Sequence, residues 1–341
     1  MNKRMLENIT DEVEKVIDAK VFPGCVIGIV CADGTREVRP FGHLTYGADA
    51  PGVVENTIYD LASVTKSIPT ASLALMLVGE GKMTHSENVT KYIPELKNDY
   101  GATIEDLLTY RVHGARMSDL KDKTPDEITG QIFLHGFDAP PGEVHYTNLS
   151  AFLLGIVVER ITGESLDYLA RRHFFDPLKM SCTTFFPPNE AFKKSDIAPT
   201  EIEENGEDIC GIVHDESARV FARARRAVGH AGLFSTTPDI LNFLEMLLQK
   251  NEGFTKSIIA GARKGWGWQI DAPWFMGSAA SHGAFGKTGF TGTSVVCDVG
   301  RGLALVILSN RTYPKRPSDA ASMHSAINVF RSSVADIIFG Q

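Results

Sequence analysis

The sequence predicts a mixed α/β fold of the α+β kind, in which helices flank an antiparallel sheet built from both ends of the chain. Near the N-terminus, an apolar run over residues 24–31 is followed by a turn and a second strand over residues 36–41. Near the C-terminus, residues 294–298 and 303–309 are two strand-like runs joined by a short glycine turn. Residues 82–205 contain helices and loops with few alternating strand patterns. We therefore expect a mostly helical insertion between two halves of one sheet.

These patterns divide the 341-residue chain into two units. Residues 1–80 and 206–341 form the expected discontinuous α/β domain, and residues 81–205 form the expected inserted helical domain. A chain of this length can bury one large core or two interlocked ones. A cleft should form where the two units meet, and Ser63 lies close to that junction.

The N-terminal part is predicted to open with a helix and a hairpin. Thr10 can cap a helix that continues to about Ala19 and has one apolar face, formed by Val13, Val16 and Ile17. The strand over residues 24–31 then leads through Asp33-Gly34, a hairpin turn signal, into the second strand.

The middle of the chain contains three predicted helices. Residues 104–108 form a short one, and residues 149–161 form an apolar one that ends at Gly163. Ser165 caps the next, which continues to about Phe174.

The second half alternates helices with strands. Thr237-Pro238-Asp239 is a strong helix start, and residues 265–270 are predicted as a strand. The last helix, over about residues 318–339, has apolar residues at spacings of three and four, which predicts a stripe lying on the sheet: Met323, Ile327, Phe330, Val334 and Ile337.

Composition excludes several functional classes. The net charge of −8 argues against a nucleic acid or an anionic membrane as the main partner. The N-terminal residues include many charged side chains and no apolar run of the signal-peptide type, so we expect a cytoplasmic protein. The five cysteines are scattered without a C-x-x-C pair, which favours reduced thiols in a reducing compartment: Cys25, Cys31, Cys182, Cys210 and Cys297.

Ser63 and Lys66 have the pattern of a nucleophile with its base attached. If a helix begins at about Ser63, the spacing of three puts the hydroxyl and the ammonium on one face. The N-terminus of that helix would also offer N–H groups to a developing oxyanion, and Pro69 would remove only a first-turn hydrogen bond. The alternative is an ordinary cap serine beside a solvated lysine, and Ser118 and Lys121 have the same spacing.

Two further motifs are candidates for the same site. Tyr146 and Asn148 follow a stiff proline turn, where a tyrosine near an ammonium can ionise more easily and an asparagine can orient a substrate amide. Residues 287–289, Lys-Thr-Gly, lead into a strand that could lie along an extended acyl substrate and bind a carboxylate. The alternatives are a core tyrosine with a capping asparagine, and a plain glycine-rich turn.

Taken together, the three motifs resemble those of the serine β-lactamase and penicillin-binding protein superfamily: S-x-x-K at Ser63, Y-x-N at Tyr146 and K-T-G at Lys287. The tyrosine motif is similar to the class C β-lactamase branch, which includes D-alanyl-D-alanine carboxypeptidases and family VIII carboxylesterases. Four other segments look like family signatures: 141–148, 214–216, 229–236 and 308–311. The resemblance covers nearly the whole chain and implies a β-lactamase/transpeptidase-like fold.

The resemblance implies roles for the reacting groups. Ser63 would be the acylated nucleophile, and Lys66 and Tyr146 would share the general-base and general-acid work, with the acylation base left open between them. The backbone N–H groups of Ser63 and Phe290 would form the oxyanion hole. We expect no cofactor and no metal, since the chain has no H-E-x-x-H motif and no histidine pair at ligand spacing.

The resemblance also implies how a substrate would bind. Asn148 would hold the substrate amide, and Lys287, Thr288 and Gly289 would lie along its carboxylate. Relatives with a G-H-A-G-L-F-S segment often have histidine where this chain has Lys287. The four arginines of residues 219–226 are either a solvated face or a cationic rim of the cleft that favours anionic substrates.

The expected reaction is hydrolysis of an ester, amide or β-lactam through a covalent acyl-enzyme. The alternatives are a D-alanyl-D-alanine carboxypeptidase or D-amino-acid peptidase, and a penicillin-binding sensor that does not turn over. Lys287 favours a carboxylate-bearing acyl donor, whereas the expected cytosolic location favours small esters or amides. We expect cleavage of short p-nitrophenyl esters with weaker opening of a cephalosporin, and greater harm from Lys287→Ala to the cephalosporin reaction.

Overall fold

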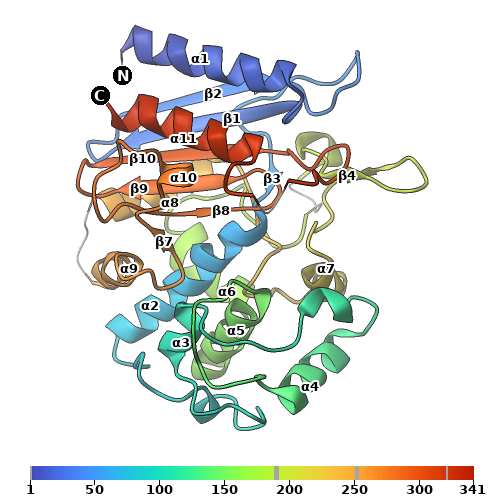
Figure 1. The fold of residues 1–341 in the computed structure, drawn as a ribbon, viewed down its shortest axis with the longest axis vertical. Helices are drawn as coiled ribbons and strands as arrows, with labels where there is room; N and C mark the ends of the chain where they lie inside the picture. Colours follow the sequence, from blue (N-terminus) through green and yellow to red (C-terminus); the bar gives the residue numbers. More distant parts are fainter. Residues whose placement is uncertain (1, 188–191, 250–252, 320–321) are drawn as a thin grey trace.

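The computed structural model describes residues 2–187, 192–249, 253–319 and 322–341, and it contains a six-stranded antiparallel sheet (Figure 1). In spatial order the strands are β2 (Arg36–Gly42), β1 (Gly24–Cys31), β10 (Leu303–Ser309), β9 (Ser294–Asp298), β8 (Phe285–Thr288) and β7 (Gln269–Ile270). The N-terminal hairpin therefore joins the C-terminal strands through β1 and β10, where Cys25 lies opposite Ser309. The predicted α/β class, with an antiparallel sheet built from both ends of the chain, is confirmed.

Both faces of the sheet are covered, which explains why β1 is apolar throughout. The long helices that cover it are α1 (Lys3–Asp18), α8 (Thr237–Leu248) and α11 (Ala326–Phe339). Successive side chains of a strand point to opposite faces. Ile27 and Ile29 accordingly pack in a core with residues of α1 and α11, whereas Val26 and Val30 belong to the larger core that includes α8.

Apart from α10 (Pro273–Met276), which packs beside α11, the remaining helices lie mostly at the end of the molecule opposite α1, at the bottom of Figure 1. They are α2 (Ser72–Gly79), α3 (Ile104–Leu108), α4 (Pro125–His135), α5 (Asn148–Thr162), α6 (Leu166–Ala170), α7 (Glu216–Arg223) and α9 (Phe254–Ala262). Two short strand pairs complete the fold: β3 (Tyr59–Asp60) with β6 (Phe234–Ser235), and β4 (Glu201–Ile202) with β5 (Asp208–Ile209). The division into domains after residues 80 and 205 stays a prediction.

The segment after β3 is not the regular helix that the sequence suggested. Residues Ala62–Lys66 form a 3₁₀ turn, Ser67–Ala71 form a π-helical segment, and α2 begins only at Ser72. Ile68 breaks the helical geometry with φ −116° and ψ 109°, just before Pro69. A 3₁₀ turn still suits the motif, because residues three apart are nearly eclipsed in it.

Three predicted element boundaries were wrong. The first helix is capped by Asn2, whose Oδ1 accepts the N–H of Met5 at 2.8 Å, while Thr10 lies inside the helix. Only Gln269–Ile270 of the predicted strand 265–270 pairs with β8. The last helix begins at Ala326 rather than near residue 318, and residues 320–321 of that prediction lie outside the described residues.

One stretch of the described chain, Ala62–Gly79, has the length and apolar character of a membrane span, with a mean hydropathy of 1.2. Most of it, 83%, is buried inside the protein. Its apolar side chains belong to the larger core, where Leu73, Leu75 and Leu77 are almost fully buried.

Candidate active site

Ser63 lines a cavity of about 780 Å³ between the sheet and the helical end of the molecule. The lining comes from residues 62–63, 114–118, 145–148 and 214–216, with Ala231, Phe290 and Arg316. Four predicted site residues therefore share one cavity: Ser63, Tyr146, Asn148 and Phe290. Ser118 lines it too, but its hydroxyl contacts Asp119 at 3.4 Å and it lies in an exposed turn.

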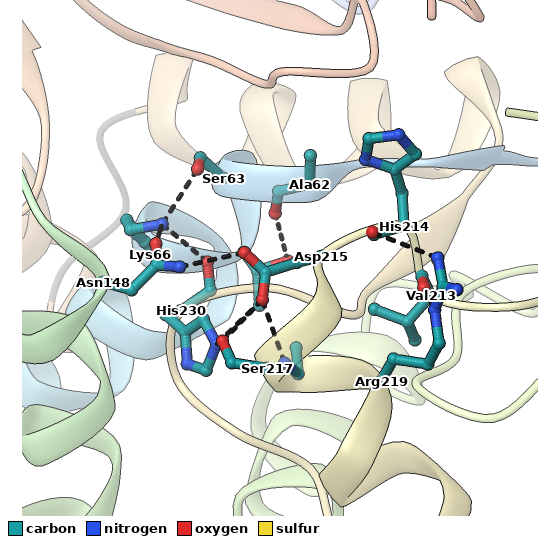
Figure 2. A network of polar contacts seen from close by, with 12 residues as sticks. Ala62, Ser63, Lys66, Asn148, Val213, His214, Asp215, Ser217, Arg219 and His230 are labelled. Carbon is teal, nitrogen blue, oxygen red and sulfur yellow. Dashed lines mark hydrogen bonds and ion pairs between the residues drawn. The ribbon is translucent and has the colours of Figure 1, made fainter. Parts of the chain in front are cut away.

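Lys66 is almost fully buried beneath Ser63 and makes three hydrogen bonds (Figure 2). Its Nζ lies 2.8 Å from Ser63 Oγ, 2.9 Å from Asn148 Oδ1 and 2.8 Å from the backbone oxygen of His230. The amide oxygen and the backbone carbonyl can only accept hydrogen bonds, whereas the serine hydroxyl can also donate. A neutral Lys66 must therefore give its two protons to Asn148 and His230, which leaves its lone pair facing the hydroxyl of Ser63.

Asn148 links Lys66 to a carboxylate that the predicted site did not include. Its Nδ2 donates to Asp215 Oδ2 at 2.9 Å while its Oδ1 accepts from Lys66. Only this orientation of the side-chain amide satisfies both neighbours, because a carboxylate cannot donate and an ammonium cannot accept. Asn148 thus uses its oxygen and one N–H within the protein, and its second N–H is what it can offer to a substrate amide.

Asp215 is held by several donors at the start of α7. Ser217 Oγ donates to its Oδ1 at 2.7 Å, and the backbone N–H of Ala218 donates to the same oxygen at 2.9 Å. Burial alone would raise the pKa of Asp215, but its contact with His230 and these hydrogen bonds hold that pKa below its usual range. Asp215 is therefore ionised when Lys66 titrates.

His230 is a buried neutral side chain rather than a second base. Its Nε2 lies 3.0 Å from Ser217 Oγ, and since the Ser217 proton goes to Asp215, Nε2 carries the proton in this contact. Its Nδ1 is buried without a hydrogen-bond partner in the described part of the chain. A second proton there would bury an unpaired N–H. Consistently, burial lowers the pKa of His230; the contact with Asp215 opposes this shift, and the nearby Lys66 adds to it.

The environment makes Lys66 a far weaker base than an exposed lysine. Burial lowers its pKa to about 8, and the carboxylate of Asp215 opposes this shift. A neutral amine is therefore present at only slightly alkaline pH. Such a group beside a serine hydroxyl is suited to accept a proton from it.

Tyr146 lies over the same lysine but ionises less easily than the sequence analysis expected. Its ring centroid is 5.4 Å from Lys66 Nζ. Although about half of the residue surface is exposed, loss of hydration raises the pKa of Tyr146 to about 12, against a hydrogen bond with Ser63 that lowers it. The net shift of the Tyr146 pKa is upward, opposite to the expected easier ionisation, because desolvation prevails. At neutral pH this phenol is protonated.

Lys287 is placed beside the cavity but behind aromatic rings. Its side chain is 1% exposed, and Nζ donates to Tyr110 Oη at 3.0 Å. The ammonium lies 4.7 Å from the ring centroid of Tyr146 and 4.6 Å from that of Tyr110. Burial, with a contribution from Lys66, lowers the pKa of Lys287 well below its usual value. Lys287 does not line the Ser63 cavity in this structure, so the carboxylate-binding role given to it is not seen here.

The loop after β8 is tied to the chain just before Ser63. Thr293 Oγ1 donates to the oxygen of Leu61 at 3.0 Å, and Thr291 Oγ1 to that of Asp60. A Cβ on Gly289 would lie 2.4 Å from the Leu61 oxygen, so only glycine permits this approach. The contact brings Phe290 and Ser63 to one cavity, whereas Thr288 pairs with Ser294 in the sheet.

Arg331 of α11 fastens the same loop from behind. Its Nη2 donates to the backbone oxygens of Gly289 at 3.1 Å and Thr293 at 2.7 Å. The side chain is 3% exposed. The sequence offered no signal for this contact, because an arginine between the apolar residues of an amphipathic helix is normally exposed to solvent. Asp215, by contrast, lies in segment 214–216, which looks like a family signature in the sequence, but the sequence did not indicate its role.

The arginine-rich stretch is not a rim of the Ser63 cavity. Arg219 donates to the backbone oxygens of Val213 and His214, and Arg226 pairs with Asp126 at 2.7 Å. The cations that do line the cavity are Arg116 and Arg316. Arg316 is held by carboxylates, at 3.1 Å from Glu201 and 2.7 Å from Glu216.

Comparisons with known proteins place the chain in a family. A sequence model of the family described as Beta-lactamase matches residues 9–327. A putative D-alanyl-D-alanine carboxypeptidase of Escherichia coli K12 is 30% identical over 323 residues, covering 81% of this chain and 73% of that protein.

Two solved structures share the fold. One is EstCE1, a hydrolase with promiscuous acyltransferase activity, with a TM-score of 0.77, 18% identity and 98% of each chain covered. The other is a beta-lactamase/D-alanine carboxypeptidase from Pseudomonas syringae, with a TM-score of 0.77, 18% identity and 99% of each chain covered.

Proposed function

Since the chain belongs to the beta-lactamase family and is a serine hydrolase, we propose that Ser63 is its nucleophile and Lys66 the base that activates it. The observation that carries this proposal is the set of contacts around Lys66 Nζ. Two of its three partners can only accept hydrogen bonds, and the third is Ser63 Oγ at 2.8 Å. The neutral amine thus has its lone pair directed at the serine proton.

Acylation follows from these contacts. Ser63 Oγ attacks the substrate carbonyl carbon while its proton passes to Lys66, and the carbonyl oxygen becomes an oxyanion. We assign the stabilisation of that oxyanion to the backbone N–H groups of Ser63 and Phe290, where one donor is typically worth about 3–4 kcal/mol. Tyr146, which holds its proton at neutral pH, donates toward the leaving oxygen or nitrogen as the bond to carbon breaks.

Deacylation uses the same groups in the reverse direction. A water takes the place of the leaving group and loses a proton as it attacks the ester carbon of acyl-Ser63. The proton that Tyr146 gave up is thereby restored, and the Ser63 oxygen leaves with a proton from Lys66. An intact set of bases favours an enzyme that turns over, and not a sensor that stalls after acylation. Steady-state product release beyond one equivalent of enzyme distinguishes the two.

We propose small esters and amides as the main substrate class. Lys287 is buried behind Tyr110 and Tyr146, and its lowered pKa weakens it as a fixed charge for a substrate carboxylate. A carboxypeptidase acting on D-alanyl peptides is the second candidate. It is favoured by Arg116 and Arg316, two cations on the cavity wall that a terminal carboxylate could reach. We also propose the cytosol as its compartment, because all five cysteines are free thiols.

Two experiments test this assignment. A fluorophosphonate probe should label the protein, and Ser63→Ala should lose both the labelling and the hydrolysis of p-nitrophenyl acetate. Ser118→Ala, the matched control in the same cavity, should keep both. Full activity in Ser63→Ala would refute the nucleophile.

The substrate class is tested with a panel of short esters, a chromogenic cephalosporin and a D-alanyl-D-alanine peptide. We expect the largest kcat/KM for the esters. A preference for the peptide, lost in Arg316→Ala, would establish the second candidate in place of the first.

A further inference from the structure

Two arginines are buried behind the loop of residues 289–293 without a carboxylate partner. Arg311 is 6% exposed and Arg331 is 3% exposed. Arg331 is bonded to neutral oxygens, those of Gly289 and Thr293 and the Asn328 side chain at 2.7 Å. No acidic group of the described residues lies within ion-pair distance of either guanidinium. The loop therefore rests on two positive charges that nothing in the described chain neutralises by contact.

Arg311 is the less satisfied of the two. Its backbone N–H donates to the oxygen of Thr291 at 2.8 Å, but Nε and Nη2 of its side chain are buried and have no acceptor among residues 2–187, 192–249, 253–319 and 322–341. Residues 320–321, which lie outside the described residues, are both alanine and carry no carboxylate. Burying a charge without a partner costs far more than burying a paired one. An anion from outside the chain would stabilise such a cation.

Arg311 is also one of the residues lining a cavity that could hold such an anion. The cavity measures about 280 Å³ and lies between the end of α1 and the start of α11. Lys20 and Lys315 also line it, against a single acid, Asp319. Ala326 and Ile327, the first residues of α11, complete the wall, and the N–H of Ala326 donates to Asp319 Oδ2 at 3.4 Å. A helix N-terminus favours negative charge.

We propose that this cavity is a binding site for a small oxyanion of the phosphate type, held by Arg311, Lys315 and Lys20. The site is separate from the Ser63 cavity, because the two share no lining residue. It is linked to the loop of residues 289–293 through Arg311, whose backbone N–H donates to the oxygen of Thr291 and whose side chain packs against Gly292. The proposal goes beyond the hydrolytic function and does not depend on it.

Inorganic phosphate is the probe. The full chain is titrated by calorimetry and by thermal unfolding at constant ionic strength, with chloride replacing phosphate in the control. We expect saturable binding of one phosphate and a Tm that rises with its concentration. Lys315→Ala and Lys20→Ala, both at exposed positions, should each weaken the affinity about tenfold, because each removes one charged contact. Lys256→Ala, at an exposed position on α9, should leave it unchanged.

Arg311→Met gives an independent readout. In phosphate-free buffer its Tm should equal or exceed that of the wild type, because a buried unpaired charge has been removed, and phosphate should no longer raise it. Ser63→Ala should bind phosphate like the wild type, which separates this proposal from the nucleophile assignment. Absence of saturable binding would overturn the proposal. Binding that is lost in Arg316→Ala but kept in Lys315→Ala would also overturn it, because that result places the phosphate in the Ser63 cavity.

Discussion

The carboxylate of Asp215 sets how easily Lys66 loses its proton, and Asp215→Asn should therefore shift the pH dependence of hydrolysis. If neutral Lys66 is the base, kcat/KM rises as the pH passes through its pKa of about 8. The negative charge of Asp215 favours the ammonium form, so it raises that pKa. Removing the charge lowers the pKa of Lys66, and the acidic limb of the profile should move to lower pH.

The size of this shift follows from the geometry. Two hydrogen bonds of 2.9 Å through the Asn148 amide separate Lys66 Nζ from the Asp215 carboxylate, which places the charges at most about 8 Å apart. With an effective dielectric constant of about 20, the interaction is about 2 kcal/mol. The corresponding shift of the limb is about 1.5 pH units. Asparagine keeps the shape and an acceptor for Ser217 and Ala218, so the fold should persist. Its amide nitrogen would face Nδ2 of Asn148, and the resulting flip of the Asn148 amide would also disfavour the ammonium of Lys66, in the same direction as the loss of charge.

The assay is kcat/KM for p-nitrophenyl acetate from about pH 6 to about pH 10, because this parameter reports the ionisations of the free enzyme. Absorbance is read at the isosbestic wavelength of p-nitrophenol and its anion, so that the signal does not depend on the ionisation of the product. Asp18→Asn, an exposed change on α1, is the matched control and should leave the profile in place. An unmoved limb in Asp215→Asn would refute Lys66 as the titrating base, and a shift to higher pH would refute the sign of the electrostatic argument.

Three further changes test other parts of the site. Tyr146→Phe should lower kcat by a factor of about 10²–10⁴, the usual contribution of a proton-transfer group. The acidic limb of the kcat/KM profile should stay near pH 8, and a shifted limb would make Tyr146 the base instead. Lys287→Ala should reduce ester and cephalosporin hydrolysis to a similar extent, since Lys287 supports the ring of Tyr146; a loss confined to the cephalosporin would restore Lys287 as the carboxylate site. Gly289→Ala should abolish activity, because its Cβ would lie 2.4 Å from the Leu61 oxygen, while the far-ultraviolet circular dichroism spectrum stays native. Normal kinetics would show that the loop can move to make room for the methyl group.

The sequence was informative where a pattern is local. The hairpins 24–41 and 294–309 were predicted because strand-like runs and turn residues lie within a few positions of each other, and β9 and β10 have the predicted bounds. Ser63, Lys66 and Tyr146 were found by short motifs, and the structure brings them together. Whether each has its assigned role stays a prediction.

Other features depend on contacts between distant segments, which no window of sequence contains. Asp215 acts through Asn148, which is 67 positions earlier in the chain, and Arg331 binds a loop about 40 positions before it. The depressed pKa of Lys287 arises from burial behind Tyr110, and a lysine in a K-T-G motif gives no hint of that. Such properties belong to the packed core and not to the motif.

The order of strands also has a consequence for synthesis on the ribosome. β1 is made first, yet one of its two neighbours is β10, and the loop that completes the site is fastened by a residue of the last helix. While it is being synthesised, the chain must therefore keep β1, which is apolar on both faces, without one of its two neighbouring strands until β10 has been translated. We expect it to need protection from aggregation during that interval. We also expect acylating activity to arise late, as a step that follows the emergence of Arg331 from the exit tunnel.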